Sequence, residues 1–137
     1  MIIDKSSSYT YGLDIRAGGS YALRITGGGA FISDGTITAT AFYASSDFRL
    51  KNIISKPNYT SEQLASLPLI KYTWKDKDDV IHLGSIAQNA EVDFPELVNT
   101  NDEGYKSLDY ATLGTIGVIS LARELIQLRE EVKQLKG

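Results

Sequence analysis

The chain has 137 residues, of which 42% are hydrophobic and 23% charged, and its formal net charge is −3. This length allows one compact domain with an appendage, and the acidic balance argues against a nucleic-acid partner, which usually meets a basic patch. No apolar run approaches the roughly 18 residues of a membrane helix. With no cysteine and one histidine, the chain lacks the ligands of a usual zinc site. We therefore expect no nucleic-acid partner, no membrane, no metal and no cofactor.

The N-terminal part, residues 1–44, repeats a short glycine-rich unit. Residues 13–19 (LDIRAGG) return ten positions later as residues 23–29 (LRITGGG). Each unit alternates apolar and polar residues and then turns on glycine, which predicts strands joined by turns, and Asp34-Gly35 predicts a further tight turn. Two units are too few to bury a core. We favour the end of a longer β-structured array over an ordinary meander that belongs to the following domain.

Two helix signals open the middle part of the chain. Asp47 or Ser46 can cap a short helix running toward Ile54. Thr60 and Gln63 fit a capping box, so a second helix is expected to begin directly after Thr60.

Two strand patterns follow the helix signals. Residues 69–75 and 80–87 alternate in hydropathy, which predicts two strands joined by a charged turn. Tyr72 and Trp74 are expected in the core of the body. Residues 91–98 predict a short helix and loop.

A single long helix is predicted for residues 109–136, capped by Asp109 or Ser107. Its apolar residues recur at spacings of three and four, the pattern of a heptad seam. A second apolar surface exists only on the upper half, so the upper half should pack on the body and the lower half has only its seam to bury. The seam is Val118, Leu121, Leu125, Leu128, Val132 and Leu135, and the second surface is Leu113, Ile116, Ile119 and Ile126.

Charged residues flank this seam. Glu124 and Glu131 occupy g positions, and Arg129 and Lys136 occupy the e positions five residues on, so these side chains can pair between parallel chains. We favour self-association over the commoner alternative, an amphipathic helix folded on its own domain. The seam itself leaves the number of chains open, with a slight lean toward two.

Ser46 and Lys51 stand at the boundary between the two kinds of structure and suggest a catalytic pair. A serine hydroxyl is a weak nucleophile until a base takes its proton. A lysine becomes that base when burial or a neighbouring cation lowers its pKa, and Arg49 can supply such a cation. Residues five apart on a helix face different sides, so Ser46 must precede the helix or two chains must contribute. The alternative, a capping serine beside a solvated lysine, is the commoner arrangement.

His82 is the single histidine of the chain. It falls in an apolar strand, so we expect a histidine of the core or of the sheet edge. A supporting role at the site is the alternative.

Residues 46–53 (SDFRLKNI) resemble the S-D-x-R-L-K signature of the C-terminal intramolecular chaperone domains of phage tail spikes and tail fibres, the endosialidase-type auto-processing peptidases. The myelin regulatory factor carries a similar domain. The likeness covers about residues 45–136 and continues through residues 72–74, 84–88, 94–98 and 108–110.

This resemblance implies an α+β fold in two parts. Residues 1–45 would be the end of a glycine-rich, triple β-helix-like fibre or spike stalk. Residues 46–137 would be the chaperone domain, with a small mixed α/β body in residues 46–108. Residues 109–136 would form the long helix of a parallel trimeric coiled coil.

The resemblance also implies a function. The domain assembles a homotrimer, folds the upstream stalk of its own chain and then cuts itself off between Ser45 and Ser46, with Ser46 as nucleophile and Lys51 as base. The candidates for supporting roles are Asp47, Arg49 and His82. The stalk would belong to the virion tail fibre or spike, and the chaperone part would be released in the host cytoplasm during assembly.

One alternative function remains open: a non-cleaving trimeric tip that stays on a tail fibre and contacts the host surface. An enzyme acting on host glycans finds no support, since no pair of carboxylates stands out in a context that would form a cleft.

Overall fold

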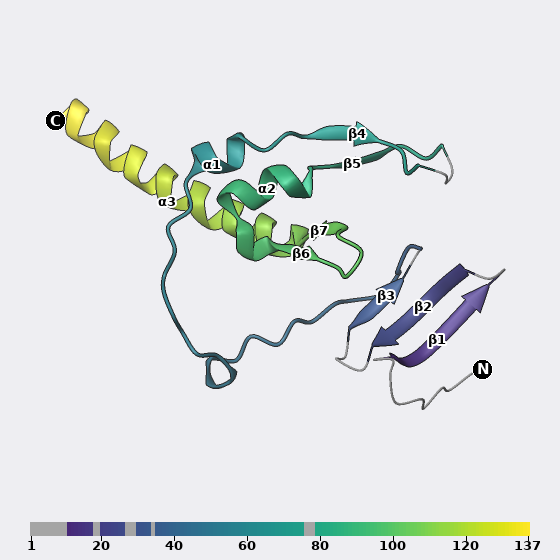
Figure 1. Cartoon of the computed structure of the whole chain (residues 1–137). Helices are drawn as coiled ribbons and strands as arrows, with labels where there is room; N and C mark the ends of the chain where they lie inside the picture. Colours follow the sequence, from purple (N-terminus) through teal and green to yellow (C-terminus); the bar gives the residue numbers. More distant parts are fainter. Residues whose placement is uncertain (1–10, 18–19, 27–29, 34, 76–78) are drawn as a thin grey trace. The chain divides into compact units, whose positions relative to one another are not determined.

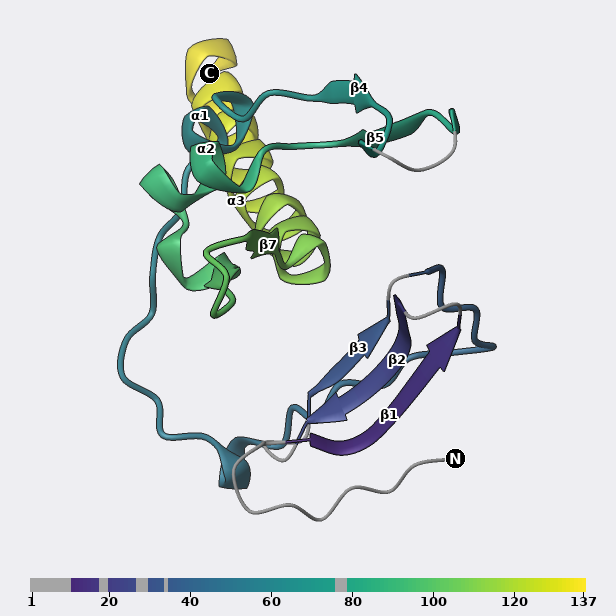
Figure 2. The same ribbon diagram turned by 45° about the vertical axis from the view of Figure 1, so that its right-hand side comes forward.

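The structure is a computed structural model of the whole chain, and it describes residues 11–17, 20–26, 30–33, 35–75 and 79–137. It contains two compact units, Met1–Ile53 and Ile54–Gly137. Figures 1 and 2 show the small sheets, the short helices and one long C-terminal helix. The predicted mixture of α and β structure is therefore confirmed, whereas the trimeric coil, the triple β-helix and the boundary at residues 45/46 remain predictions.

The first unit contains a three-stranded antiparallel sheet in the order β1-β2-β3. Leu23 in the central strand lies opposite Ile15 on one side and Ser33 on the other. Ile15 is 46% exposed, so within one chain the sheet leaves apolar surface uncovered. The predicted glycine turns at residues 18–19 and 27–29, and Asp34, lie outside the described residues. The strands are β1 (Tyr11–Ala17), β2 (Ser20–Thr26) and β3 (Phe31–Ser33).

A long irregular segment, residues 35–60, follows the sheet and contains one regular element, the 3₁₀ turn η1 (Phe48–Leu50). The predicted helix running toward Ile54 is therefore wrong. Lys51 leaves the turn in an extended conformation, with φ −120° and ψ 131°. β-Branched residues such as Ile53 and Ile54 favour extended backbone, which explains why the turn does not continue.

The first helix of the second unit begins with the predicted capping box. Thr60 Oγ1 accepts a hydrogen bond from Gln63 N at 3.3 Å, and Gln63 Oε1 accepts one from Thr60 N at 3.0 Å. The helices and 3₁₀ turn of this unit are α1 (Ser61–Ala65), α2 (Ala87–Asp93), η2 (Pro95–Leu97) and α3 (Tyr110–Lys136). Two antiparallel hairpins join them, β4 (Ile70–Tyr72) with β5 (His82–Gly84), and β6 (Val98–Thr100) with β7 (Lys106–Leu108).

The core of the second unit is small. Among the described residues, Ala90, Phe94 and Leu97 are its buried hydrophobic side chains, and Phe94 is fully enclosed. The ring of Tyr59 packs on Phe94 with a centroid distance of 5.0 Å. Leu97 O accepts a hydrogen bond from Asp109 N at 2.9 Å, which ties η2 to the start of α3.

The long helix α3 begins where the sequence predicted. Asp109 is its N-cap and accepts a hydrogen bond from Thr112 N at 3.0 Å. Leu113 and Ile116 are half-buried, as expected for the surface that packs on the body. Ile119 and Ile126 were predicted to share that surface but are 44% and 62% exposed in the single chain, so the packed surface is shorter than predicted.

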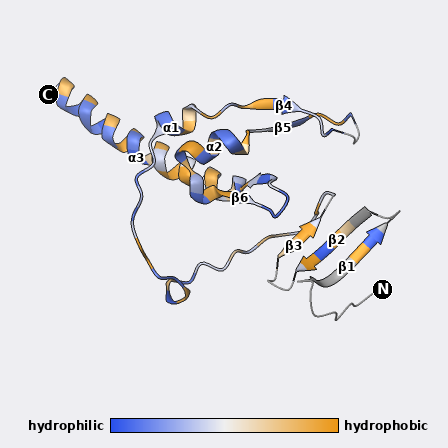
Figure 3. Ribbon diagram, viewed as in Figure 1, coloured by the Kyte–Doolittle hydropathy of each residue, from blue (hydrophilic) through white to orange (hydrophobic). Residues whose placement is uncertain are grey.

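The predicted seam of α3 is solvent-exposed in the single chain, with exposed fractions between 39% at Val132 and 86% at Leu135. Figure 3 shows apolar residues recurring along this helix to its C-terminal end. By length and composition alone, α3 is also the one helix in the described part of the chain that qualifies as a membrane span, which is weak evidence. The absence of a membrane partner therefore remains a prediction.

The β4–β5 hairpin holds an aromatic cluster. Tyr72 stacks on His82 with a centroid distance of 5.5 Å, and Trp74 meets the Tyr72 ring edge-on at 5.4 Å. Trp74 was predicted in the core, but it is 52% exposed. A two-stranded hairpin presents its ends to solvent unless another layer covers them, so its aromatic residues pack mainly on one another.

Candidate active site

Ser46 and Lys51 meet within one chain. Lys51 Nζ donates a hydrogen bond to Ser46 Oγ over 2.7 Å. The 3₁₀ turn η1 lies between them, and Lys51 is its C-cap, with its backbone N–H bonded to Phe48 O at 3.1 Å. A single tight turn followed by an extended residue thus brings together two side chains that a regular helix would separate.

Asp47 and Arg49 brace this turn. Asp47 is the N-cap of η1, and its Oδ1 accepts a hydrogen bond from Arg49 N at 2.9 Å. The Arg49 guanidinium also donates to both carboxylate oxygens, with Nε at 3.1 Å from each and Nη2 at 2.6 Å from Oδ2. The side-chain hydrogen bond from Arg49, followed by the bond from its backbone N–H, lowers the pKa of Asp47, and the same side-chain contact raises the pKa of Arg49.

This pairing changes the role that the sequence suggested for Arg49. The charge of its guanidinium is balanced by Asp47, so Arg49 is not the lone cation that would favour a neutral amine at Lys51. Arg49 N is bonded to Asp47, so this amide is also committed to the turn. The structure therefore favours a positioning role for Asp47 and Arg49.

The pair lies open to water in the single chain. Ser45, Ser46 and Lys51 are exposed, and the apolar side chains Phe48 and Leu50 of the intervening turn are 75% and 76% exposed. Such apolar side chains normally find cover in a folded assembly. The hydrogen bond between Ser46 and Lys51 forms within one chain, but the water-excluding surroundings of an active site are not present there.

His82 belongs to the second unit, in β5, where it is half-buried in the aromatic cluster. Its ring also meets Trp74 at a centroid distance of 6.2 Å. This arrangement fits a histidine of the sheet, and its supporting role remains a prediction. Within the ranges that the structure describes, no three His, Asp or Glu side chains gather where a metal ion could bind.

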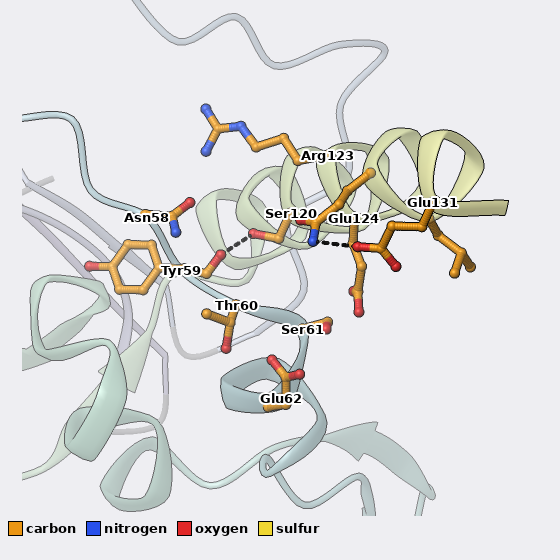
Figure 4. Close-up of a pocket in the computed structure, with 11 residues that line it drawn as sticks. Asn58, Tyr59, Thr60, Ser61, Glu62, Ser120, Arg123, Glu124 and Glu131 are labelled. Carbon is orange, nitrogen blue, oxygen red and sulfur yellow. Dashed lines mark hydrogen bonds between the residues drawn. The ribbon is translucent and has the colours of Figure 1, made fainter. Parts of the chain in front are cut away.

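A groove of about 370 Å³ lies in the second unit between residues 58–62 and α3. Ser120 of α3 is buried beside it and donates a hydrogen bond from Oγ to Tyr59 O at 2.8 Å (Figure 4). Tyr59 Oη in turn donates to Glu96 Oε2 at 3.0 Å. Neither Ser120 nor Tyr59 is recognisable from the sequence, because residues so far apart in the chain carry no local signal of their contact.

Residues 46–99 match the family model described as chaperone of endosialidase, a family classed among the peptidases. The match begins at Ser46 and spans somewhat less than half of the chain. It confirms the resemblance found in the sequence for this segment. No curated protein matches the chain.

The family supports an intramolecular chaperone role and a peptidase-like, self-cleaving domain. It also supports an association with a phage tail fibre of the same chain. The family match by itself assigns no role to Ser46 or Lys51.

Proposed function

We propose that this chain assembles as a homotrimer, folds the stalk that precedes Ser46, and then releases its chaperone part by cutting the bond between Ser45 and Ser46. The stalk would belong to a tail fibre or spike of a virion. The observation that supports this proposal best is the 2.7 Å hydrogen bond between Lys51 Nζ and Ser46 Oγ, at the start of the segment that matches the family.

The chemistry is an acyl shift from nitrogen to oxygen followed by hydrolysis of the resulting ester. Lys51 takes the proton of the Ser46 hydroxyl, and Ser46 Oγ attacks the carbonyl carbon of Ser45. The C–N bond breaks, the Ser46 nitrogen leaves as an amine with the transferred proton, and an ester joins Ser45 to Ser46 Oγ. Water then hydrolyses the ester, which gives a new carboxylate on Ser45 and restores the hydroxyl. A positioned base contributes roughly 10²–10⁴-fold to such a step.

Assembly can supply the condition that the single chain lacks. A solvated lysine amine is protonated at neutral pH and cannot accept a proton, whereas burial favours the neutral amine. Phe48 and Leu50 offer apolar surface on either side of Arg49 that a second copy can cover. Cleavage would then follow association, so that only correctly assembled chains are cut.

The chaperone role follows from the physics of the stalk. An intertwined β-structure has mainly non-local contacts, so it folds slowly and exposes its strand edges. A coil formed by α3 would hold copies together and raise their local concentration. Once the chaperone part has left, the stalk would be trapped kinetically in its folded form.

The intact mass of the purified protein under denaturing conditions tests the proposal. We expect wild type to give two pieces that separate between Ser45 and Ser46, and Ser46→Ala and Lys51→Ala to stay whole. Ser55→Ala and Lys56→Ala are matched controls nearby in the chain and should be cut. A wild-type protein that is trimeric yet whole would instead support the non-cleaving fibre tip.

A further inference from the structure

The groove beside α3 has an acidic lining. Glu62 lies on the α1 side, and Glu124 and Glu131 lie on the α3 side (Figure 4). Arg123 is the one basic residue of the lining, so three carboxylates against one guanidinium leave a formal charge of −2. An acidic groove fits a basic side chain.

The groove borders the predicted seam. Leu128, a d residue of the seam, lines it and is 53% exposed. Glu124 and Glu131 are the g residues on the same side of the helix. An association through the seam would therefore place the neighbouring helix at the mouth of this groove.

Two charged residues beside the seam find no opposite charge along their own helix. No basic residue lies three or four positions from Glu124, and no acidic residue lies three or four positions from Arg129. On the outer face, in contrast, Lys133 and Glu130 form an i,i+3 ion pair at 2.6 Å. Pairs within one helix need this spacing, so Glu124 and Arg129 are arranged for a partner on another chain.

A parallel, in-register neighbour supplies that partner. In a parallel coil a g residue faces the e residue five positions on in the next chain, which brings Arg129 of a second copy to Glu124. An antiparallel neighbour would bring g residues together and oppose glutamate to glutamate. The charge pattern therefore selects a parallel second copy.

We propose that this groove is a docking site for a second copy of the chain and that it takes the guanidinium of Arg129 from that copy. Glu124 receives Arg129 from the helix side, and Glu62 of α1 adds the globular body to the interface. The inference rests on the self-association in the proposed function, but it names a contact surface beyond the coil. Through this surface the body takes part in setting the register of the chains.

Charge variants in a Ser46→Ala chain, which is expected to stay whole, test the contact. Sedimentation equilibrium should show that Arg129→Glu weakens association about tenfold or more, because every interface of the assembly loses a pair and gains a repulsion. Glu124→Arg combined with Arg129→Glu should recover most of the loss. Lys133→Glu is the matched control and should leave association unchanged.

A double-mutant cycle isolates the groove from the coil. Glu62→Gln should weaken association two- to fivefold in the chain with Arg129, and should have no effect once Arg129 is replaced by glutamine. If Glu62→Gln has the same effect with and without Arg129, α1 does not contact that side chain and the docking site is overturned.

Disulfide trapping identifies the occupant, because the chain has no cysteine of its own. Ser61→Cys with Arg129→Cys should give covalent dimers and trimers under oxidation, whereas Ser61→Cys with Lys133→Cys should not. If only disulfides within one chain form, the residue that reaches the groove belongs to the same chain, and the docking site is overturned. A trimer with neither cross-links nor charge effects overturns the docking site and leaves the proposed function intact, and a chain that remains monomeric and uncut overturns both.

Discussion

The hydroxyl of Tyr110 binds both backbone polar groups of Ser85. It accepts a hydrogen bond from Ser85 N at 2.8 Å and donates one to Ser85 O at 3.0 Å. Ser85 follows β5 directly, and Tyr110 is the first residue of α3. One side chain therefore fastens the base of the β4–β5 hairpin to the start of the long helix.

Tyr110→Phe should destabilise the second unit by about 1–3 kcal/mol, because it removes both bonds and leaves two backbone groups without this partner. Urea unfolding of the Ser46→Ala chain measures the change. Tyr105→Phe, at an exposed tyrosine in the loop before β7, is the matched control and should change stability by less than about 0.5 kcal/mol. Equal effects of the two variants would contradict the anchoring role of Tyr110.

Gly84→Ala tests the same junction from the other side. A Cβ on Gly84 would lie 2.6 Å from Tyr110 Oη and 3.3 Å from Tyr72 Cε1, so the Tyr110 ring must shift. We expect a loss of about 1–3 kcal/mol in urea unfolding. Gly117→Ala, where the added Cβ meets nothing within 4 Å, should instead stabilise α3 by about 0.5–1 kcal/mol. The prediction would be contradicted if Gly117→Ala destabilised the protein and Gly84→Ala did not.

Asp47→Asn should slow self-cleavage by about 10–100-fold, because small displacements of reacting groups cost this much in rate. The amide keeps a cap for Arg49 N but loses the two-pronged ion pair that braces η1. A time course of intact mass during refolding measures the rate. Exchanging the two residues, Asp47→Arg with Arg49→Asp, restores an ion pair and should recover part of the cleavage rate. Asp79→Asn is the control for the loss of one carboxylate and should leave the rate unchanged.

Acid should break the ion pair between Asp47 and Arg49. The pKa of Asp47 is lowered in the folded turn, so the pair is present above the ordinary aspartate pKa of about 3.9 and is lost as pH falls through the lowered value. An NMR titration of the Ser46→Ala chain should place the Asp47 midpoint below the ordinary value. In the Arg49→Gln variant the midpoint should rise toward it, and an unchanged midpoint would contradict the assigned cause.

Ser120→Ala should destabilise the second unit by about 1–2 kcal/mol, because Tyr59 O loses the donor from α3. Thermal unfolding of the Ser46→Ala chain measures this. Ser66→Ala removes an exposed hydroxyl bonded to Gln63 O and should cost less than about 0.5 kcal/mol. A larger cost at Ser66 than at Ser120 would show that the contact between α3 and residue 59 contributes little.

Local signals in the sequence were sufficient for several elements. The capping box at Thr60 and Gln63 and the cap at Asp109 are each formed by residues within three positions, so composition and spacing reveal them. The family signature at residues 46–53 likewise lies in one short run, and the family match includes it.

Contacts between distant residues could not be predicted in this way. Tyr110 is 25 positions from Ser85, and Ser120 is 61 positions from Tyr59. At the candidate site, the sequence predicts Asp47 as a helix cap and Arg49 as an unpaired cation. In the structure the two residues form an ion pair across the 3₁₀ turn η1. This turn forms in place of a longer helix because the backbone at Lys51 is extended.

During translation, the exposed apolar face of β1–β3 is synthesised before the exposed seam of α3. A ribosome completes β2 about a hundred residues before it reaches the end of the seam. At roughly 5–20 residues per second, the strands wait on the order of 5–20 s for the helix that can gather other copies. During that interval the chain has not yet made the helix that could gather other copies, so slower translation would lengthen the period in which strands from neighbouring ribosomes can pair out of register.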